Sequence, residues 1–338
     1  MVVHVPPTPD EDEEVRVIVA AIDSYGNIAP DYKGKVKLSV PVKTKGLPQE
    51  YNFSAADKGV KIFKVRFLQP AVFVITAIDT LHSEINGTSN LIVTDGSFGP
   101  EKIFFGDIHT HSQLSDGRLP PKQKAQEVSL HRGCDFWALT DHCHDLTEKR
   151  IKRLNKVLEE FNIPSEFVTI PAYEWTSSMG QKPAKRKQYG HRNVYFTKNI
   201  SRVFDAVEPA GDTPEKLKKV LEKEYGEVCI INHFHCGDPV FLPDVDDAVE
   251  VSGWAGDFCR EFCGVENDIG GKYSLQQVFE KSIPIGVVAG SDHGTEAYYA
   301  GLPAELTGVY SNKLERSHIF DSIKKHKTFA TTGTKTLL

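Results

Sequence analysis

The chain has 338 residues, of which 40% are hydrophobic and 25% are charged, a composition typical of folded globular proteins. This length allows two domains, each with its own hydrophobic core. A formal net charge of −6 argues against nucleic-acid binding, which calls for a basic face. No stretch of apolar residues is long enough to predict a membrane-spanning helix.

The N-terminal segment and the cysteines bear on where the protein works. The segment MVVHVPPTPDEDEEV is acidic and proline-rich, without the charged-then-apolar order of a signal peptide. Six cysteines, at positions 134, 143, 229, 236, 259 and 263, form no recognisable disulfide pattern. We therefore expect reduced thiols and a cytoplasmic location.

The first ninety or so residues read as short strands. Residues 15–20 are apolar and β-branched, residues 35–40 and 60–67 alternate between apolar and polar side chains, and residues 73–77 form a compact apolar run. No segment with a helical period interrupts them. Several short strands at regular spacing predict a small all-β sandwich over residues 1–96.

After a linker at 94–100, strands and helices alternate, which predicts an α/β domain over residues 101–338. The pattern predicts helices at 122–132, 149–161 and 214–225, and strands at 136–140, 167–170, 228–231 and 285–289. Thr213, followed by Pro214, is the expected N-cap of the third helix.

Metal-binding residue types follow four of these strands. They are Asp141-His142, Glu174, His233 and Asp292-His293. The carboxyl ends of parallel strands meet at one edge of a sheet or barrel, which is where such folds place their functional groups. Any one of these residues alone could be structural, but their recurrence at four strand ends predicts a shared site.

His109 and His111 open this series with a His-x-His pattern. On a strand the two imidazoles share a face, so both can reach one metal ion. Asp116, in the loop that follows, can add a carboxylate. Imidazole suits zinc, iron, nickel or copper, and added carboxylates broaden the choice toward manganese.

Further candidates lie downstream. Glu174 could bridge two ions, since each carboxylate oxygen can bind one. His191 adds an imidazole, and either His233 or His235 adds another. His144 is a candidate for substrate binding or for supporting a ligand.

Nucleophilic catalysis is a weaker interpretation. Cys143 follows His142, and Cys236 follows His235, so a Cys/His pair stays open. Neighbours in sequence point in different directions, however, so adjacency argues little. The chain shows no G-x-S-x-G, Walker A or dinucleotide-binding glycine pattern.

The segments GDIHTHSQLSDG, FWALTDH, AYEWTS, GHRN, INH and GSDH occur in an order that resembles the PHP (polymerase and histidinol phosphatase) superfamily. The resemblance covers residues 101–333 and is greatest to the branch that opens with Gly-Asp-x-His-x-His behind a small β domain. It implies a distorted (β/α)7 barrel with a bi- or trinuclear metal site. The N-terminal segment is similar to an immunoglobulin-like or invasin-like sandwich.

The resemblance also implies a set of ligands for two or three ions of zinc, manganese or iron. It places His109 and His111 on one ion, Glu174 between two, Asp116 and His142 on a neighbouring ion, His191 and His233 on a third, and Asp292 near the first pair. The family ends its last motif with Asp-x-His, whereas Asp292 and His293 are adjacent here. His293 would then bind metal or contact substrate.

The function implied is phosphoester hydrolysis by metal-activated water, with His142, Asp292 or His293 transferring a proton. Arg118, Lys185 and Arg192 are candidates for recognising phosphate. We expect a small phosphorylated substrate, no nucleic-acid or membrane partner, and any oligomer to form through the β domain. Two alternatives stay open: an amidohydrolase-like enzyme that cleaves a C–N or C–O bond, and an inactive binding module.

Overall fold

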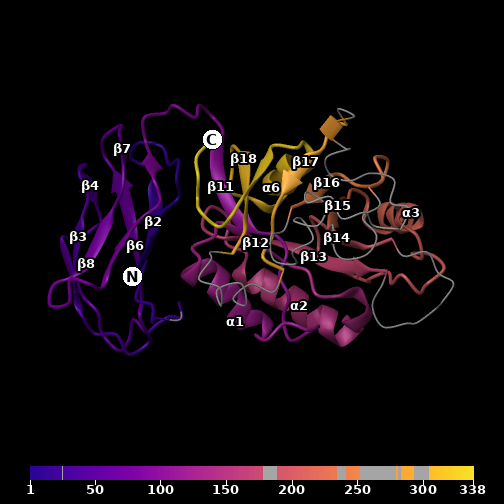
Figure 1. Ribbon diagram of the computed structural model, residues 1–338, viewed down its shortest axis with the longest axis horizontal. Helices are drawn as coiled ribbons and strands as arrows, with labels where there is room; N and C mark the ends of the chain where they lie inside the picture. Colours follow the sequence, from indigo (N-terminus) through magenta and orange to yellow (C-terminus); the bar gives the residue numbers. More distant parts are fainter. Residues whose placement is uncertain (25, 178–188, 234–240, 252–278, 281–282, 293–303) are drawn as a thin grey trace.

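The computed structural model describes the chain except residues 25, 178–188, 234–240, 252–278, 281–282 and 293–303. Figure 1 shows two bodies side by side, a β domain in indigo and violet and a larger body that holds the helices. The chain passes from one to the other between β10 (Ile92–Val93) and β11 (Lys102–Asp107).

Two four-stranded antiparallel sheets make up the β domain. One has the order β1 (Val2–His4), β2 (Glu14–Ala20), β6 (Val60–Phe67), β4 (Thr44–Lys45), and the other has the order β5 (Glu50–Asn52), β3 (Lys35–Ser39), β8 (Thr76–Asp79), β9 (Asn86–Thr88). A short pair, β7 (Val72–Phe73) and β10, completes it.

Alternating side chains of the two sheets meet in one core. Val17, Val19 and Val65 come from the first sheet, and Val36 and Leu38 from the second, all buried in the same cluster. A period of two puts every second residue of a strand on the same face, so two such sheets bury their apolar faces against each other. The predicted sandwich is confirmed.

The larger body is built on one nine-stranded sheet. Its order is β17 (Gly286–Val288), β16 (Ala248–Glu250), β15 (Cys229–His233), β14 (His191–Tyr195), β13 (Val168–Thr176), β12 (Phe136–Leu139), β11, β18 (Leu306–Ser311), β19 (Thr328–Thr331). β14 and β18 run antiparallel to their neighbours.

This sheet curls into a nearly closed, distorted barrel. The main-chain N–H of Ala289, just past β17, donates to Thr307 Oγ1 at 2.9 Å, and that hydroxyl donates to the Ala289 carbonyl at 2.6 Å. These bonds bring β17 to β18, at the other side of the sheet. The predicted barrel behind a sandwich is confirmed, with β18 and β19 extending the sheet beyond the seven strands expected.

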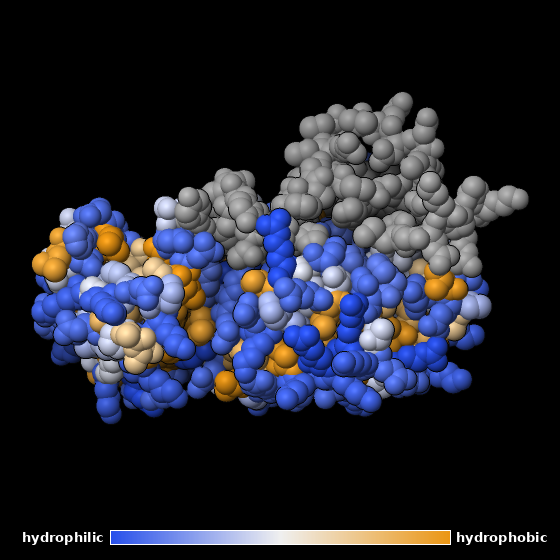
Figure 2. Space-filling view, turned by 90° about the horizontal axis from the view of Figure 1, so that it is seen from below, coloured by the Kyte–Doolittle hydropathy of each residue, from blue (hydrophilic) through white to orange (hydrophobic). Residues whose placement is uncertain are grey.

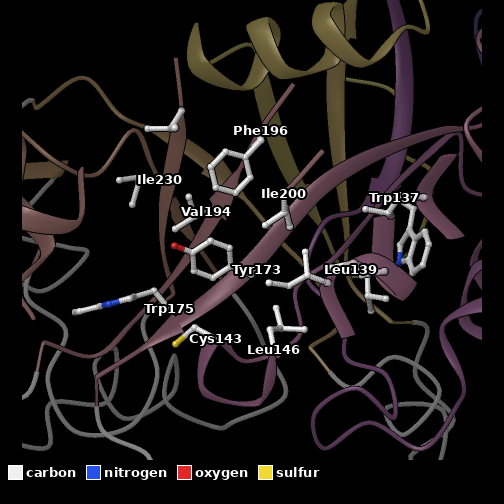
Figure 3. Close-up of a cluster of buried hydrophobic side chains, with 14 of the residues drawn as sticks. Trp137, Leu139, Cys143, Leu146, Tyr173, Trp175, Val194, Phe196, Ile200 and Ile230 are labelled. Carbon is white, nitrogen blue, oxygen red and sulfur yellow. The ribbon is translucent and has the colours of Figure 1, made fainter. Parts of the chain in front are cut away.

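Among the described residues, three helices pack on the outer face of the sheet. They are α1 (Pro121–Gln126), which continues into a π-helical turn (Glu127–His131), α2 (Glu148–Phe161) and α3 (Pro214–Tyr225). Leu154 and Leu158 of α2 and Leu217 of α3 join the apolar cluster on this face. Figure 3 shows its strand side, where Tyr173 lies near Phe196.

α6 (Arg316–Lys324) covers the amino ends of the strands. Arg316 Nε donates to the carbonyl of Thr169 at 2.7 Å, and Lys324 Nζ donates to the carbonyl of Val228 at 2.7 Å. Both carbonyls lie at the start of a strand, where α6 adds its apolar side chains to the inner cluster. The carboxyl ends of the strands therefore form the opposite end of the barrel.

Most predicted elements are present, but some differ from the prediction, and β16, β18 and α6 were not predicted. The predicted helix 122–132 divides into α1 and the π-helical turn, the predicted strand 167–170 extends to Thr176, and β14 was not predicted as a strand. Cys134, Cys143 and Cys229 are free and buried, and the other three cysteines lie outside the described residues.

Figure 2 shows one face of the molecule, mostly hydrophilic, with apolar residues in small separate groups. Among the described residues, no helix is long and apolar enough to span a bilayer.

Candidate metal centre

Strand alternation carries polar side chains into the barrel. In β13, Tyr173 and Trp175 belong to the outer apolar cluster and Ala172 to the inner one. Because residues two apart share a face, Glu174 and Thr176 point inward with Ala172. The sequence YEWT thus places one carboxylate inside the barrel near its carboxyl end.

The reversed direction of β14 adds a histidine at the same end. His191, its first residue, pairs with Thr176 of β13 on one side and with His233 of β15 on the other. Because β14 is antiparallel, its beginning lies beside the ends of its neighbours. His191, Glu174 and His233 therefore converge from three adjacent strands.

His109 and His111 lie beyond the end of β11 rather than within a strand. β11 ends at Asp107, and the segment after it is held by a bridge from Thr110 to Asp292 and by a bond from the His111 N–H to the Asp292 carbonyl at 3.0 Å. The two imidazoles still meet, with 3.2 Å between their Nε2 atoms. The two imidazoles therefore converge as predicted, although they lie on the segment after β11 and not on a strand.

Glu174 stands among the imidazoles. Its Oε2 lies 2.8 Å from His142 Nδ1, 3.3 Å from His111 Nε2 and 3.9 Å from His109 Nε2. Its Oε1 lies 2.6 Å from His191 Nδ1. The two oxygens of this buried carboxylate thus face different imidazoles, as a bridging ligand requires.

Asp292 contacts the same cluster from the far side. Its Oδ1 lies 3.0 Å from His111 Nε2 and 3.5 Å from His109 Nε2, and its Oδ2 lies 3.9 Å from His233 Nε2. Its backbone φ is +58°, a left-handed conformation that is uncommon for residues other than glycine.

These side chains form three overlapping groups whose ligand atoms lie within 4.8 Å of one another. The groups are His109, Glu174 and His233; His109, His111 and Asp292; and His111, His142 and Glu174. All of these residues are buried. Because His109, His111 and Glu174 each belong to two groups, the arrangement suits ions that lie next to one another.

Asp116 lies at the exposed rim of the cluster, with 41% of its side chain accessible. Its Oδ1 lies 3.4 Å from His111 Nδ1, and its Oδ2 lies 3.3 Å from His142 Nε2. His144 stacks on His142 with 5.2 Å between ring centroids. The solvent-facing side of the site is thus on the His142 side.

Glu250, at the end of β16, is a site residue that the sequence did not reveal. Its two oxygens lie 2.8 and 2.9 Å from His109 Nδ1, and Asn193 Nδ2 donates to Oε2 at 3.0 Å. Glu250 follows the same pattern as the predicted ligands, because it is a carboxylate at the end of an apolar strand. β16 is only three residues long, too short for its periodicity to be recognised.

The electrostatics favour bound cations. Burial opposes the charged form of His109, but Glu250 and Asp292 outweigh it and raise the pKa of this imidazole well above its ordinary value. Burial likewise opposes protonation of His142, yet Glu174 and Asp116 raise its pKa to about 10.

Two of the site's carboxyls shift in the complementary direction, whereas burial raises the pKa of the third, Glu250. Burial opposes ionisation of Glu174 and Asp292, but neighbouring histidines hold the pKa of both carboxyls well below the ordinary range. Without metal, protons thus supply the positive charge that this cluster demands.

The orientation of His109 fits a metal ligand. Its Nδ1–H donates to Glu250, so Nε2 faces His111, Glu174 and Asp292. A carboxylate behind an imidazole fixes the ring and raises the basicity of the nitrogen that binds metal. The residues present therefore fit divalent ions.

The described candidates for phosphate recognition, Arg192 and Arg118, lie in different environments. Arg192 is buried on the outer face, where its Nε and Nη2 pair with Asp246 at 2.7 and 3.1 Å. This pair removes Arg192 from the candidates. Arg118 is exposed in the loop after Asp116. Lys185 lies outside the described residues, as do His235 and His293.

The Cys/His alternative has no support at Cys143. This thiol lies in the outer apolar cluster (Figure 3), and its burial raises its pKa. A thiol held in its protonated form is a poor nucleophile. Cys236 lies outside the described residues.

Comparison with known proteins gives distant likenesses. Residues 143–234 match the model of DUF3604, a family of unknown function. No curated protein matches. A two-domain protein from Bacteroides vulgatus, described as containing a predicted PHP-like metal-dependent phosphoesterase, is 16% identical over 69% of this chain and 66% of its own, with a TM-score of 0.46.

Two further solved structures are less similar. The D0-D1 domain of intimin is 11% identical over 32% of this chain and 55% of its own, with a TM-score of 0.24. PhoD is 11% identical over 54% of this chain and 41% of its own, also with a TM-score of 0.24.

Proposed function

We propose that this chain is a metal-dependent hydrolase of small phosphoesters, with two or three ions of zinc, manganese or iron in the cluster around Glu174. The observation that supports the proposal is the overlap of three buried ligand groups at the carboxyl end of the barrel. Imidazole and carboxylate ligands in such numbers match these metals.

In this proposal each ligand has a defined place. His109, His111 and Asp292 would hold one ion, and His142 and Glu174 would hold a neighbouring one, with Asp116 approaching from the rim. His191 and His233 complete the side of Glu174 that faces β14 and β15. Bound divalent ions supply the positive charge that activates water and neutralises phosphate.

The chain itself contributes orientation and proton transfer. Thr176 Oγ1 lies 2.9 Å from His142 Nδ1 and fixes this ring, which has its other nitrogen toward the solvent-facing rim. We assign proton transfer to His142, Asp292 or His293. An amidohydrolase-like reaction on the same ligands is the alternative outcome of the experiment below.

The test is elemental analysis of the purified protein, followed by assays on phosphomonoesters and phosphodiesters with metal removed and restored as Zn²⁺ or Mn²⁺. We expect two or three equivalents of metal and phosphoester hydrolysis that follows metal content. The variant Glu174→Gln should lose both.

Each other outcome points elsewhere. Stoichiometric metal without phosphoester turnover, but with hydrolysis of amides or lactones, would favour the amidohydrolase-like alternative. Protein that takes up no metal would contradict the proposal and favour the binding module.

A further inference from the structure

Asp107 is a buried carboxylate beside the ligand groups. At the end of β11, its Oδ1 accepts the main-chain N–H of His109 at 3.2 Å and that of Ser291 at 3.1 Å. Its Oδ2 accepts the hydroxyl of Ser291. Asp107 thus joins the first ligand segment, at His109, to the last, at Asp292.

Arg132 completes this arrangement from the outer layer. It follows the π-helical turn, is 6% exposed, and donates from Nη1 to Asp107 Oδ2 and to Ser291 Oγ, the latter at 3.4 Å. Its Nη2 donates to the carbonyls of Ala304 and Glu305, at 3.2 Å each. One guanidinium therefore holds three separate segments of chain.

The conformation of Asp292 explains why such support matters. A left-handed φ in a residue other than glycine is strained and persists only where the surroundings impose it. Ser291 is fixed by Asp107 on one side, and the carbonyl of Asp292 is fixed by the His111 N–H on the other. These bonds orient the carboxylate of Asp292.

We propose that Arg132 and Asp107 are positioning residues that set the geometry of the ion site formed by His109, His111 and Asp292. The inference rests on the proposed function, because it assumes that these three residues hold an ion. Arg132 acts through Asp107 and Ser291 and contacts no ligand atom itself.

The experiment measures the affinity for Zn²⁺ alone, by competition with a chromogenic chelator, in the wild-type chain and in Arg132→Met and Ser291→Ala. Loss of a supporting partner typically weakens metal binding by about 10- to 100-fold. We expect such a loss for Arg132→Met and a smaller one for Ser291→Ala.

The matched control is Arg316→Met, which removes a guanidinium bonded to Thr169 at the opposite end of the barrel. Its Zn²⁺ affinity should equal that of the wild type. Circular dichroism melting of each metal-free variant separates loss of fold from loss of binding.

The failures are distinguishable. A wild-type chain that binds no Zn²⁺ contradicts the proposed function. A wild-type chain that binds Zn²⁺ with the same affinity as a folded Arg132→Met overturns the positioning role alone. Should Arg132→Met not fold, an unchanged affinity in Ser291→Ala overturns it.

Discussion

The imidazoles of the candidate site are oriented by neighbours that the ligand groups do not include. Glu250 lies behind His109, Thr176 Oγ1 lies 2.9 Å from His142 Nδ1, and Ser115 Oγ lies 3.2 Å from His111 Nδ1. A hydrogen bond to one ring nitrogen determines which nitrogen is left to bind metal. At the scale of single residues, the site therefore includes the residues that orient the ligands as well as the ligands themselves.

The variant Glu250→Gln tests the orienting contact behind His109. The amide keeps the size of the side chain but removes the charge behind the ring, so we expect metal affinity to fall about 10- to 100-fold while the fold is retained. Titration of the metal-free protein with Mn²⁺ measures the change. Equal affinities in the variant and the wild type would show that Glu250 does not support the ligand.

At the scale of elements, a helix whose start is marked by neighbouring residues in the sequence formed where it was predicted. Helix α3 begins after Thr213, whose hydroxyl accepts the N–H of Lys216 at 3.3 Å, and has Pro214 at its first position. Capping and the proline are read within a few residues of sequence, because the forces behind them act over one helical turn.

Thr213→Ala should therefore lower the free energy of unfolding by about 1 kcal/mol, since an N–H at the helix start loses its acceptor. Urea denaturation measures the change, and Thr213→Ser, which keeps the hydroxyl, is the matched control. Metal content should be unaffected, because α3 lies on the outer face. Equal stability of the alanine and serine variants would contradict the capping role.

The features that were not predicted from the sequence depend on pairing between segments that are far apart in the chain. The reversal of β14 is set by its register with β13 and β15, which no local pattern records. Glu250 was missed because β16 is so short, and the role of Arg192 was misjudged because its partner Asp246 is far along the chain. The ligand-bearing strand ends were predictable, whereas their supporting contacts were not.

At the scale of the whole molecule, the β domain and the barrel share polar contacts. His4 Nε2 lies 2.8 Å from the carbonyl of His131, and Lys102 Nζ lies 2.9 Å from Asp10 and 2.6 Å from Glu13. Burial, with the nearby charge of Lys335, lowers the pKa of His4 to about 3. This imidazole is therefore neutral at the junction.

The consequence is a pH-dependent stability. Unfolding returns His4 to an ordinary pKa near 6.5, so the unfolded chain binds the extra proton between about pH 6.5 and pH 3. The free energy of unfolding should fall with decreasing pH across this window, by at most about 1.4 kcal/mol per pH unit from this group.

Denaturant unfolding at several pH values checks this expectation. His4→Gln should flatten the dependence, because glutamine does not titrate. His82→Gln, at an exposed histidine of the same domain, should leave it unchanged. A dependence that is identical in wild type and His4→Gln would contradict the assignment.

The antiparallel entry of β14 also has a consequence for how this barrel could diversify. The connection from β13 to β14 leaves and returns at the mouth of the candidate site, and its base is tied by bonds of Ser177 to Gly190 and Tyr189. These bonds and the ladder between β13 and β14 keep Glu174 and His191 in register, so this carboxylate and this imidazole can persist while the sequence that joins the two strands changes.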